Sequence, residues 1–346
     1  MVSQPTRPHW SQIKVEGLFG ADETLKDLLQ DSLDLMPDRD GSEAKPFLVR
    51  STDDFLRIGT GNWTMGSYYK QVADIDFDGV DFTPVGHVAG SGFTAFTGSY
   101  DGNGYKISNA TYNAGASMFI GLFASVEDAV LENLGIFDCS FSSSDKVIGS
   151  LAGRAIDSDI SRIAVDGGSI TTTTSSGYSY AGGLVGTITG SAVANVSDCY
   201  FRGTISTANA STQHASGLFL AISEADVSLT VNVDNCWTAV SLGGSSTDAK
   251  SSALVSVQNA PTRDLTLNVT NCKFNNEKDL STAVGEFSSG GTYTPTITGT
   301  EGLTTANMYK QASYSGWDFI DTWQIIEDAS YPYFQYRLAQ SPAPAE

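Results

Sequence analysis

The stretch "GGLVGT" at residues 182–187 has four counterparts elsewhere in the chain, and together they decide the fold. Each places small residues beside a leucine: "GLFASV" (121–126), "GSLAGR" (149–154), "SGLFLA" (216–221) and "SALVSV" (252–257). The shared leucines, Leu122, Leu151, Leu184, Leu218 and Leu254, are 29, 33, 34 and 36 residues apart. Such a period indicates a repeat architecture.

A second repeated piece follows most of these stretches: "LENLGIFDCSF" (131–141), "VANVSDCYF" (193–201), "LTVNVDNCWT" (229–238) and "LNVTNCKF" (267–274). The pieces are rich in Val, Ile, Thr and Ser and alternate apolar with polar residues, which favours short strands separated by turns. A unit of about 30 residues cannot bury its own apolar face, whereas units stacked at roughly 4.8 Å per coil can. The sequence therefore predicts an all-β parallel β-helix, or solenoid, rather than a propeller or a leucine-rich repeat.

The four cysteines, Cys139, Cys199, Cys236 and Cys272, are expected at one equivalent position in successive coils. There they would form an inward ladder of buried free thiols; disulfides and a metal site are the alternatives. An asparagine precedes each of the last three cysteines by four residues, at Asn195, Asn232 and Asn268. We expect these asparagines to form a ladder at a turn.

The ends of a solenoid have to be covered. Residues 22–36, "DETLKDLLQDSLDLM", place Leu25, Leu28, Leu29, Leu33 and Met36 on one stripe of a predicted helix. This helix either caps the first coil or anchors the chain to a partner. We divide the chain into an attachment or capping segment (1–45), the β-helix (46–300), an aromatic C-terminal cap (301–338) and a flexible tail (339–346).

Aromatic residues are concentrated between residues 309 and 336. The favoured interpretation is an apolar plug over the last coil, because each ring removes a large area from water. The alternative is a platform on which sugars stack, with Trp317, Trp323, Tyr331 and Tyr333 as the candidate ligand-binding residues.

The 39 acidic and 19 basic residues give a net charge of −20, which disfavours nucleic acid and anionic lipid as partners. Residues 1–20 lack the apolar core of a secretory signal, and no apolar run approaches the length of a membrane span. We expect a soluble chain that does not insert into membranes.

The segment "ADIDFDG" (73–79) carries Asp74, Asp76 and Asp78 at alternate positions. An EF-hand that starts at Asp74 would need Glu at position 12, where the chain has Val85. We therefore expect a strand with Ile75, Phe77 and Phe82 inward and the acids in solvent. There are two alternatives. The first is a weak cation site at Asp74, Asp76 and Asp78, and the second is a carboxylate cluster for glycoside cleavage that contains these three residues and Asp101. The histidines, His9, His87 and His214, are expected at the surface or in turns.

The ordered series of motifs resembles the GLUG-repeat β-helix proteins of bacterial cell surfaces and phage. The resemblance covers residues 46–336, from "PFLVRSTDDFLRI" (46–58) and "YYKQVADIDFDGVDFTPVG" (68–86), through the "GGLVG" coils, to "GWDFIDTWQIIEDASYPYFQY" (316–336). It implies a right-handed β-helix used in adhesins and other exposed proteins, with no catalytic residues or cofactors to transfer.

The N-terminal "SQPTRPHW" (3–10) is of the Pro-rich type that can begin phage fibre proteins. We therefore expect a non-enzymatic structural or receptor-binding protein on a virion surface: a fibre, spike or head decoration. It would contact other virion proteins through its N-terminal segment, and its further expected partners are host-surface polysaccharide and copies of itself, as a trimer. The alternatives are an adhesin module on a bacterial surface and a polysaccharide-cleaving tailspike.

Overall fold

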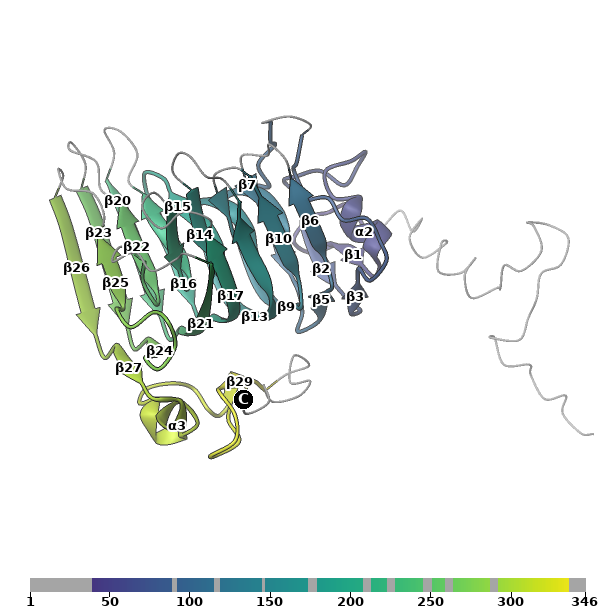
Figure 1. Ribbon diagram of the computed structural model, residues 1–346. Helices are drawn as coiled ribbons and strands as arrows, with labels where there is room; N and C mark the ends of the chain where they lie inside the picture. The colour runs from purple at the N-terminus through teal and green to yellow at the C-terminus, as the bar shows by residue number, and fades with distance from the viewer. Residues whose placement is uncertain are drawn as a thin grey trace, which may run out of the picture.

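The chain folds into a parallel β-helix whose coils stack side by side (Figure 1). This computed structural model describes residues 39–88, 92–114, 119–144, 147–173, 179–207, 213–222, 228–244, 251–258, 264–286 and 292–335. The predicted fold is confirmed. In these ranges, no helix has both the length and the apolar character needed to cross a membrane.

The largest sheet is divided by two corners of the coil into three stacks of parallel strands, which we call faces A, B and C. Face A contains β1 (Phe47–Val49), β2 (Tyr68–Gln71), β4 (Ser99–Asp101), the start of β9 (Val130–Phe137), the start of β13 (Asp159–Thr172), β16 (Val193–Ser197), β20 (Leu229–Asp234), β23 (Asp264–Thr270) and β26 (Thr292–Thr298). Face B contains β3 (Ile75–Asp76), β5 (Lys106–Ser108), the end of β9, the middle of β13, the starts of β17 (Tyr200–Thr207) and β21 (Trp237–Gly244), β24 (Lys273–Asn275) and β27 (Glu301–Leu303). Face C contains β6 (Thr111–Ala114), β10 (Ser140–Ser143) and the ends of β13, β17 and β21.

Two further parallel sheets complete the coils in the middle of the stack. The first contains β7 (Phe119–Ile120), β11 (Val147–Ile148), β14 (Ser179–Gly182) and β18 (Gln213–Ser216). The second contains β8 (Phe123–Glu127), β12 (Ala152–Ile156), β15 (Val185–Thr189), β19 (Phe219–Ile222), β22 (Val255–Gln258) and β25 (Val284–Glu286). Outside the coils lie α2 (Thr52–Leu56), α3 (Thr305–Met308), η2 (Gln311–Ser313) and an antiparallel pair, β28 (Trp323–Gln324) and β29 (Tyr333–Phe334).

The repeat register predicted from the leucines is confirmed. All five leucines are fully buried, and backbone bonds link the last four from coil to coil, as from Leu184 N to Leu218 O (2.9 Å). The small residues before each leucine are needed because the next coil is so close. A Cβ atom on Gly217, directly before Leu218, would lie 1.8 Å from the backbone oxygen of Ala253 in the next coil, so glycine is required there.

The corner between faces A and B is built from residues in the left-handed region. Their φ angles lie between 49° and 57°, and the residues are Asn133, Arg162, Asp198, Asn235 and Asn271. Asparagine and aspartate tolerate this conformation better than other residues with side chains. The residue after each corner points into the core, and in the last three coils it is Cys199, Cys236 or Cys272.

The predicted cysteine ladder is therefore correct for three cysteines and wrong for Cys139. Cys139 follows Asp138 (φ 53°) at the corner between faces B and C, where its coil neighbours are Ala110 and Gly168. The segment 131–141 passes through both corners, and its cysteine comes after the second. All four thiols are free and buried, as expected, and burial raises the pKa of Cys139 to about 12.

The ends of the chain differ in part from expectation. The predicted helix 22–36 and the tail 339–346 lie outside the described residues. The aromatic segment was expected to plug the end of the stack, but it runs back along the outside of face B (Figure 1). Face B carries an outward-facing patch of apolar side chains that includes Tyr200 and Trp237. The rings of the aromatic segment bury this patch, which explains their position.

Candidate functional site on the lateral surface

The aspartates of the segment 73–79 stabilise turns. Asp76 Oδ1 accepts hydrogen bonds from Asp78 N (3.1 Å) and Asn109 Nδ2 (2.8 Å), and Asp74 Oδ1 accepts one from Lys106 N (3.1 Å). The bond from Asn109 lowers the pKa of Asp76. The inward positions of Ile75, Phe77 and Phe82 are confirmed, as is the exposure of the acids. Within the described residues, no group of three His, Cys, Asp or Glu side chains is arranged to hold a metal ion.

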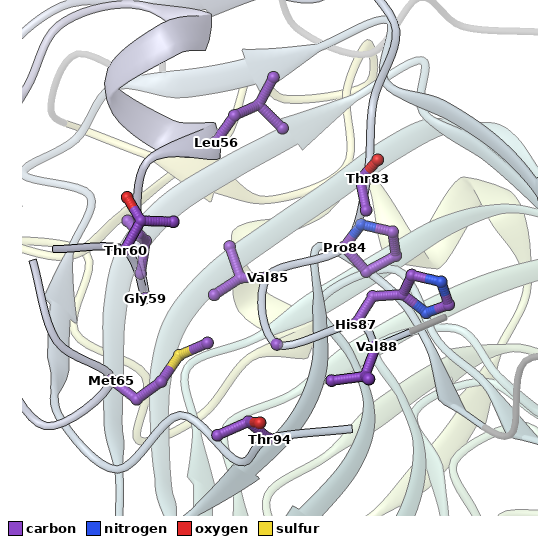
Figure 2. A pocket seen from close by; sticks show the side chains of 12 residues that line it. Leu56, Gly59, Thr60, Met65, Thr83, Pro84, Val85, His87, Val88 and Thr94 are labelled. Carbon is purple, nitrogen blue, oxygen red and sulfur yellow. The ribbon is translucent and has the colours of Figure 1, made fainter. Parts of the chain in front are cut away.

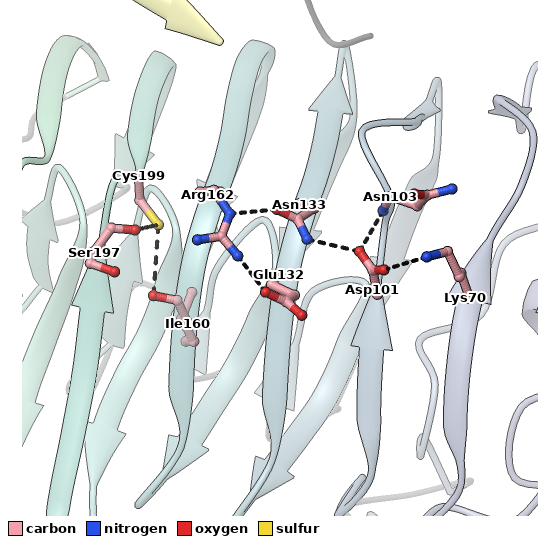
Figure 3. Close-up of polar contacts among 9 residues, drawn as sticks. All are labelled: Lys70, Asp101, Asn103, Glu132, Asn133, Ile160, Arg162, Ser197 and Cys199. Atoms are coloured by element: carbon pink, nitrogen blue, oxygen red, sulfur yellow. Dashed lines mark hydrogen bonds and ion pairs between the residues drawn. The ribbon is translucent and has the colours of Figure 1, made fainter. Parts of the chain in front are cut away.

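A polar network that sequence reasoning missed crosses face A and its corner (Figure 3). Asp101 accepts from Asn133 Nδ2 (2.9 Å) and pairs with Lys70 Nζ (3.3 Å). Arg162 donates to Asn133 Oδ1 and to Glu132 Oε2, both at 2.5 Å. Each charge is thus matched by a partner from a neighbouring coil. The one sequence signal was a long basic side chain at a corner that otherwise uses Asn or Asp.

The aromatic candidates for sugar binding are mostly covered. Trp317, Trp323 and Tyr331 are buried, and Tyr333 is half-buried in β29. Trp323 Nε1 donates to Asp198 Oδ1 (3.2 Å), and Tyr331 stacks on Trp237 with ring centroids 4.8 Å apart. These rings hold the segment onto face B and present no open platform to a sugar.

The asparagines form a ladder, but in strands of face A rather than at a turn. Asn232 Nδ2 donates to Asn195 Oδ1, and Asn268 Nδ2 donates to Asn232 Oδ1, each over 2.8 Å. Asn195 in turn donates to Asp159 (2.7 Å).

The prediction also misplaced His214, which is fully buried in β18 and stacks on Tyr180.

Face C differs from the rest of this acidic chain because its strands carry no charged residue. Its segments read TYNA, SFSS, SITT, TIST and SLGG. Phe141, Ile170 and Ile205 alternate inward and are buried. The outward side chains form two in-register rows: Thr111, Ser140, Ser169, Thr204 and Ser241 in one, and Asn113, Ser142, Thr171 and Ser206, ending at Gly243, in the other.

The hydroxyl groups of face C remain largely available for a ligand. Within the described part of the chain, the bond found among these outward side chains joins Ser169 Oγ to Ser140 Oγ (3.3 Å). Each hydroxyl can donate and accept, and strands lie about 4.8 Å apart. A hydroxyl therefore recurs on all five strands in the first row and on three strands in the second. Such an array suits a long, uncharged, hydroxyl-rich ligand better than a small ion.

The comparisons with known proteins agree with this architecture. The GLUG motif matches residues 177–206, one coil that runs from β14 to β17. Halomucin of Haloquadratum walsbyi is 30% identical over 157 residues, which cover 42% of this chain but only 2% of halomucin. A crystal structure from Bacteroides ovatus, described as that of a candidate immunoglobulin A1 protease, superposes with a TM-score of 0.54 at 18% identity. The superposition covers 86% of this chain and 94% of that one.

At 18% identity, this likeness is evidence for the fold alone. The GLUG match falls on a coil whose leucine, glycine and corner positions recur along the stack. The chain is therefore a parallel β-solenoid protein with GLUG-type repeats.

Proposed function

We propose that this protein is a rigid, non-enzymatic surface scaffold that binds a neutral polysaccharide along face C. The observation that carries the proposal is a pair of uncharged rows, in register over five strands, on a chain of net charge −20. One row has a hydroxyl on each of the five strands, and the other has hydroxyls on three. An anionic polymer would be repelled by the surrounding acids, whereas a neutral one can bond to the hydroxyls of each coil in turn.

The setting that we propose is a virion surface, with the chain as a fibre, spike or head decoration that recognises a host glycan. Residues 1–45 would contact other virion proteins, and a homotrimer is the expected assembly. The alternative setting is an adhesin module on a cell surface. The similarity to halomucin, a protein of a cellular organism, supports this alternative.

The carboxylates at the N-terminal end support the non-enzymatic assignment over a polysaccharide-cleaving tailspike. Glycoside cleavage requires an acid with a raised pKa. The pKa of Asp76 is lowered instead, and Asp101 is engaged by Lys70 and Asn133. We expect no new polysaccharide chain ends in the presence of this protein.

Co-sedimentation with insoluble neutral and acidic polysaccharides tests the proposal. We expect the wild type to bind a neutral polymer, the Thr204→Asp variant on face C to lose at least tenfold in affinity, and Thr266→Asp on face A to bind like the wild type. Equal binding by both variants would move the site away from face C. Detection of the protein on purified particles or on cell envelopes decides between the two settings.

A further inference from the structure

A pocket of about 400 Å³ opens where the stack begins (Figure 2). One wall is the segment that follows α2, and the other is residues 83–88. Pro84 and Val85 are buried, whereas Val88 is 46% exposed, so the pocket has a covered floor and an accessible rim. Its volume is that of a site for one small molecule.

The lining is apolar with a rim of hydroxyl groups. None of the twelve lining residues is Asp, Glu, Lys or Arg, although the chain has a net charge of −20. Figure 2 shows three threonines at separate points around Val85: Thr60, Thr83 and Thr94. Thr60 Oγ1 donates to Arg57 O (2.7 Å) and can still accept a bond. The exposed hydroxyls of Thr83 and Thr94 have no partner within the described part of the chain.

The pocket adjoins the N-terminal end of face C. Tyr112 lies in β6 between Thr111 and Asn113, the first members of the two outward rows. Its ring turns inward onto the core. Because β6 is the first strand of face C, the Tyr112 hydroxyl can contact the pocket residue His87, 3.1 Å from Nε2. Two side chains in contact therefore separate the start of the rows from the pocket.

The two ends of face C differ in charge. At the C-terminal end, Leu242 lies between Ser241 and Gly243, the last members of the rows, and Leu242 N donates to Asp279 Oδ2 (2.6 Å). A carboxylate thus borders this end, whereas the pocket at the other end is lined by apolar and hydroxyl groups. The N-terminal end is therefore the one that suits the terminal residue of a neutral polymer.

A 6-deoxyhexose matches the chemistry of this pocket. As the terminal residue of a glycan, it presents one methyl group and three ring hydroxyls, which correspond to one apolar wall and three threonines. An ordinary hexose would bring a further hydroxyl against the apolar wall, where this group loses water without gaining a partner. An anionic sugar would be repelled by the acidic chain.

We propose that this pocket binds a terminal 6-deoxyhexose residue of the polysaccharide on face C. Its methyl group lies against Met65 and Val88, and its ring hydroxyls bond to the three threonines. The inference rests on the proposed function for the identity of the polymer, while the pocket itself can be tested with a single sugar. Recognition of the terminal residue fixes the direction in which the polymer lies along the rows.

NMR titration of the full chain with methyl glycosides tests the pocket without the polymer. The probes are the methyl α-glycosides of L-rhamnose and L-fucose. The matched controls are those of L-mannose and L-galactose, which differ from the probes by the hydroxyl at C6. We expect a deoxy sugar to bind with a dissociation constant at least tenfold below that of its control. Equal affinities within both pairs, or no binding by any of the four, would overturn the proposal.

Two pairs of variants locate the site. Val88→Asp places a charge against the methyl group and should weaken binding of the deoxy sugar at least tenfold. Val80→Asp adds the same charge at a valine that is 38% exposed outside the pocket, and it should bind like the wild type. Thr83→Val removes a rim hydroxyl and should weaken binding several-fold, whereas Thr97→Val, at an exposed threonine outside the pocket, should not. Equal affinities within either pair would contradict the site.

The polymer separates this proposal from the function proposed for face C. A neutral polysaccharide that ends in the bound deoxy sugar is compared with the same polymer after an exoglycosidase has removed that residue. We expect trimming to weaken binding at least tenfold in the wild type and to have no effect in Val88→Asp, while Thr204→Asp weakens binding of both polymers. Equal binding of both polymers by the wild type would overturn the pocket as the terminal site and leave face C in place. Binding of the glycoside but of neither polymer would instead overturn the function proposed for face C.

Discussion

Tyr331 lies flat against Trp237, with ring centroids 4.8 Å apart and an angle of 6° between the ring planes. Trp237 is also stacked on Tyr200 of the preceding coil, at 4.6 Å and 10°. A ring from the C-terminal segment thus extends a stack of rings that the solenoid itself forms. This arrangement explains why the segment covers face B and not the end of the last coil.

The aromatic segment should stabilise the whole solenoid. Trp323 is fully buried, so Trp323→Ala is expected to lower the free energy of unfolding by about 3–5 kcal/mol. Tyr333→Ala, at a half-buried ring of the same segment, should cost less. Chemical denaturation measures both variants. A smaller loss for Trp323→Ala than for Tyr333→Ala would show that the segment is only loosely attached.

The glycines of the repeat should not tolerate a side chain. Gly217→Ala would place a Cβ atom 1.8 Å from the oxygen of Ala253 in the adjacent coil, and overpacking of this kind costs about 1–3 kcal/mol or more. Gly66→Ala is the control, because its Cβ atom would lie 3.4 Å from Thr97 Oγ1. Thermal unfolding should separate the two variants. Equal Tm values would mean that adjacent coils can move apart at little cost.

Arg162 occupies a corner that asparagine occupies in other coils. Arg162→Asn loses the pair with Glu132, but a half-exposed pair of this kind contributes only about 0–1 kcal/mol, and asparagine suits a φ of 52°. We expect little net change in stability. Arg162→Val should lower the free energy of unfolding by about 1–3 kcal/mol, because a branched residue is strained there. Denaturant titration measures both variants. Equal free energies of unfolding for the valine and asparagine variants would contradict this account.

The carboxyl of Asp198 should make part of the stability depend on pH. Burial raises the pKa of this carboxyl, so the folded chain binds the carboxyl proton more tightly than the unfolded chain does. The charged form therefore opposes folding, and its cost disappears as the pH falls through the raised pKa. Asp198→Asn keeps an acceptor for Trp323 and should be more stable than the wild type at pH 7, with the difference shrinking toward acid pH.

Asp76 provides the matched control for this experiment. Its pKa is lowered by the bond from Asn109, so its charged form favours folding at neutral pH and this contribution is lost in acid. Asp76→Asn should therefore destabilise the protein at pH 7. Stability curves between pH 3 and pH 8 test both signs. A difference of the same sign for both variants would refute the assigned causes.

The buried thiols should report on global unfolding. Burial raises the pKa of Cys139 to about 12, and Cys236 is fully buried with its pKa also raised. Thiolate is the reactive form, so a thiol reagent at pH 8 should leave the native protein unmodified and label four groups in denaturant. Rapid labelling of one thiol under native conditions would show that its coil opens locally.

The sequence allowed the fold to be predicted because the leucines and glycines report the coil directly. Periodicity placed Leu184 and Leu218 in neighbouring coils, where a backbone bond joins them. It failed for Cys139 because two different corners can each be followed by an inward small residue. Pattern alone does not say which corner a given cysteine follows.

The candidate site was harder to predict, because it depends on which face of the coil each residue lies on. The rows of face C join residues about 30 positions apart, such as Thr111, Ser140 and Ser169, whose polarity is unremarkable in the linear sequence. The outward rings of Tyr200 and Trp237 likewise gave no signal that residues 305–334 would return to cover them.

The unequal leucine spacings, from 29 to 36 residues, have a consequence for how this molecule can change in size. The ladders stay in register while the connections between strands absorb the difference, so the natural increment of length is one entire turn of the solenoid. Duplication of residues 184–217 would lengthen both rows of face C by one step and offer a longer stretch of polymer more points of attachment. Deletion of a single residue inside β16 would instead reverse the facing of the side chains beyond it. The length of face C and its avidity for a polymer can therefore be increased by duplicating an existing coil, without a new surface.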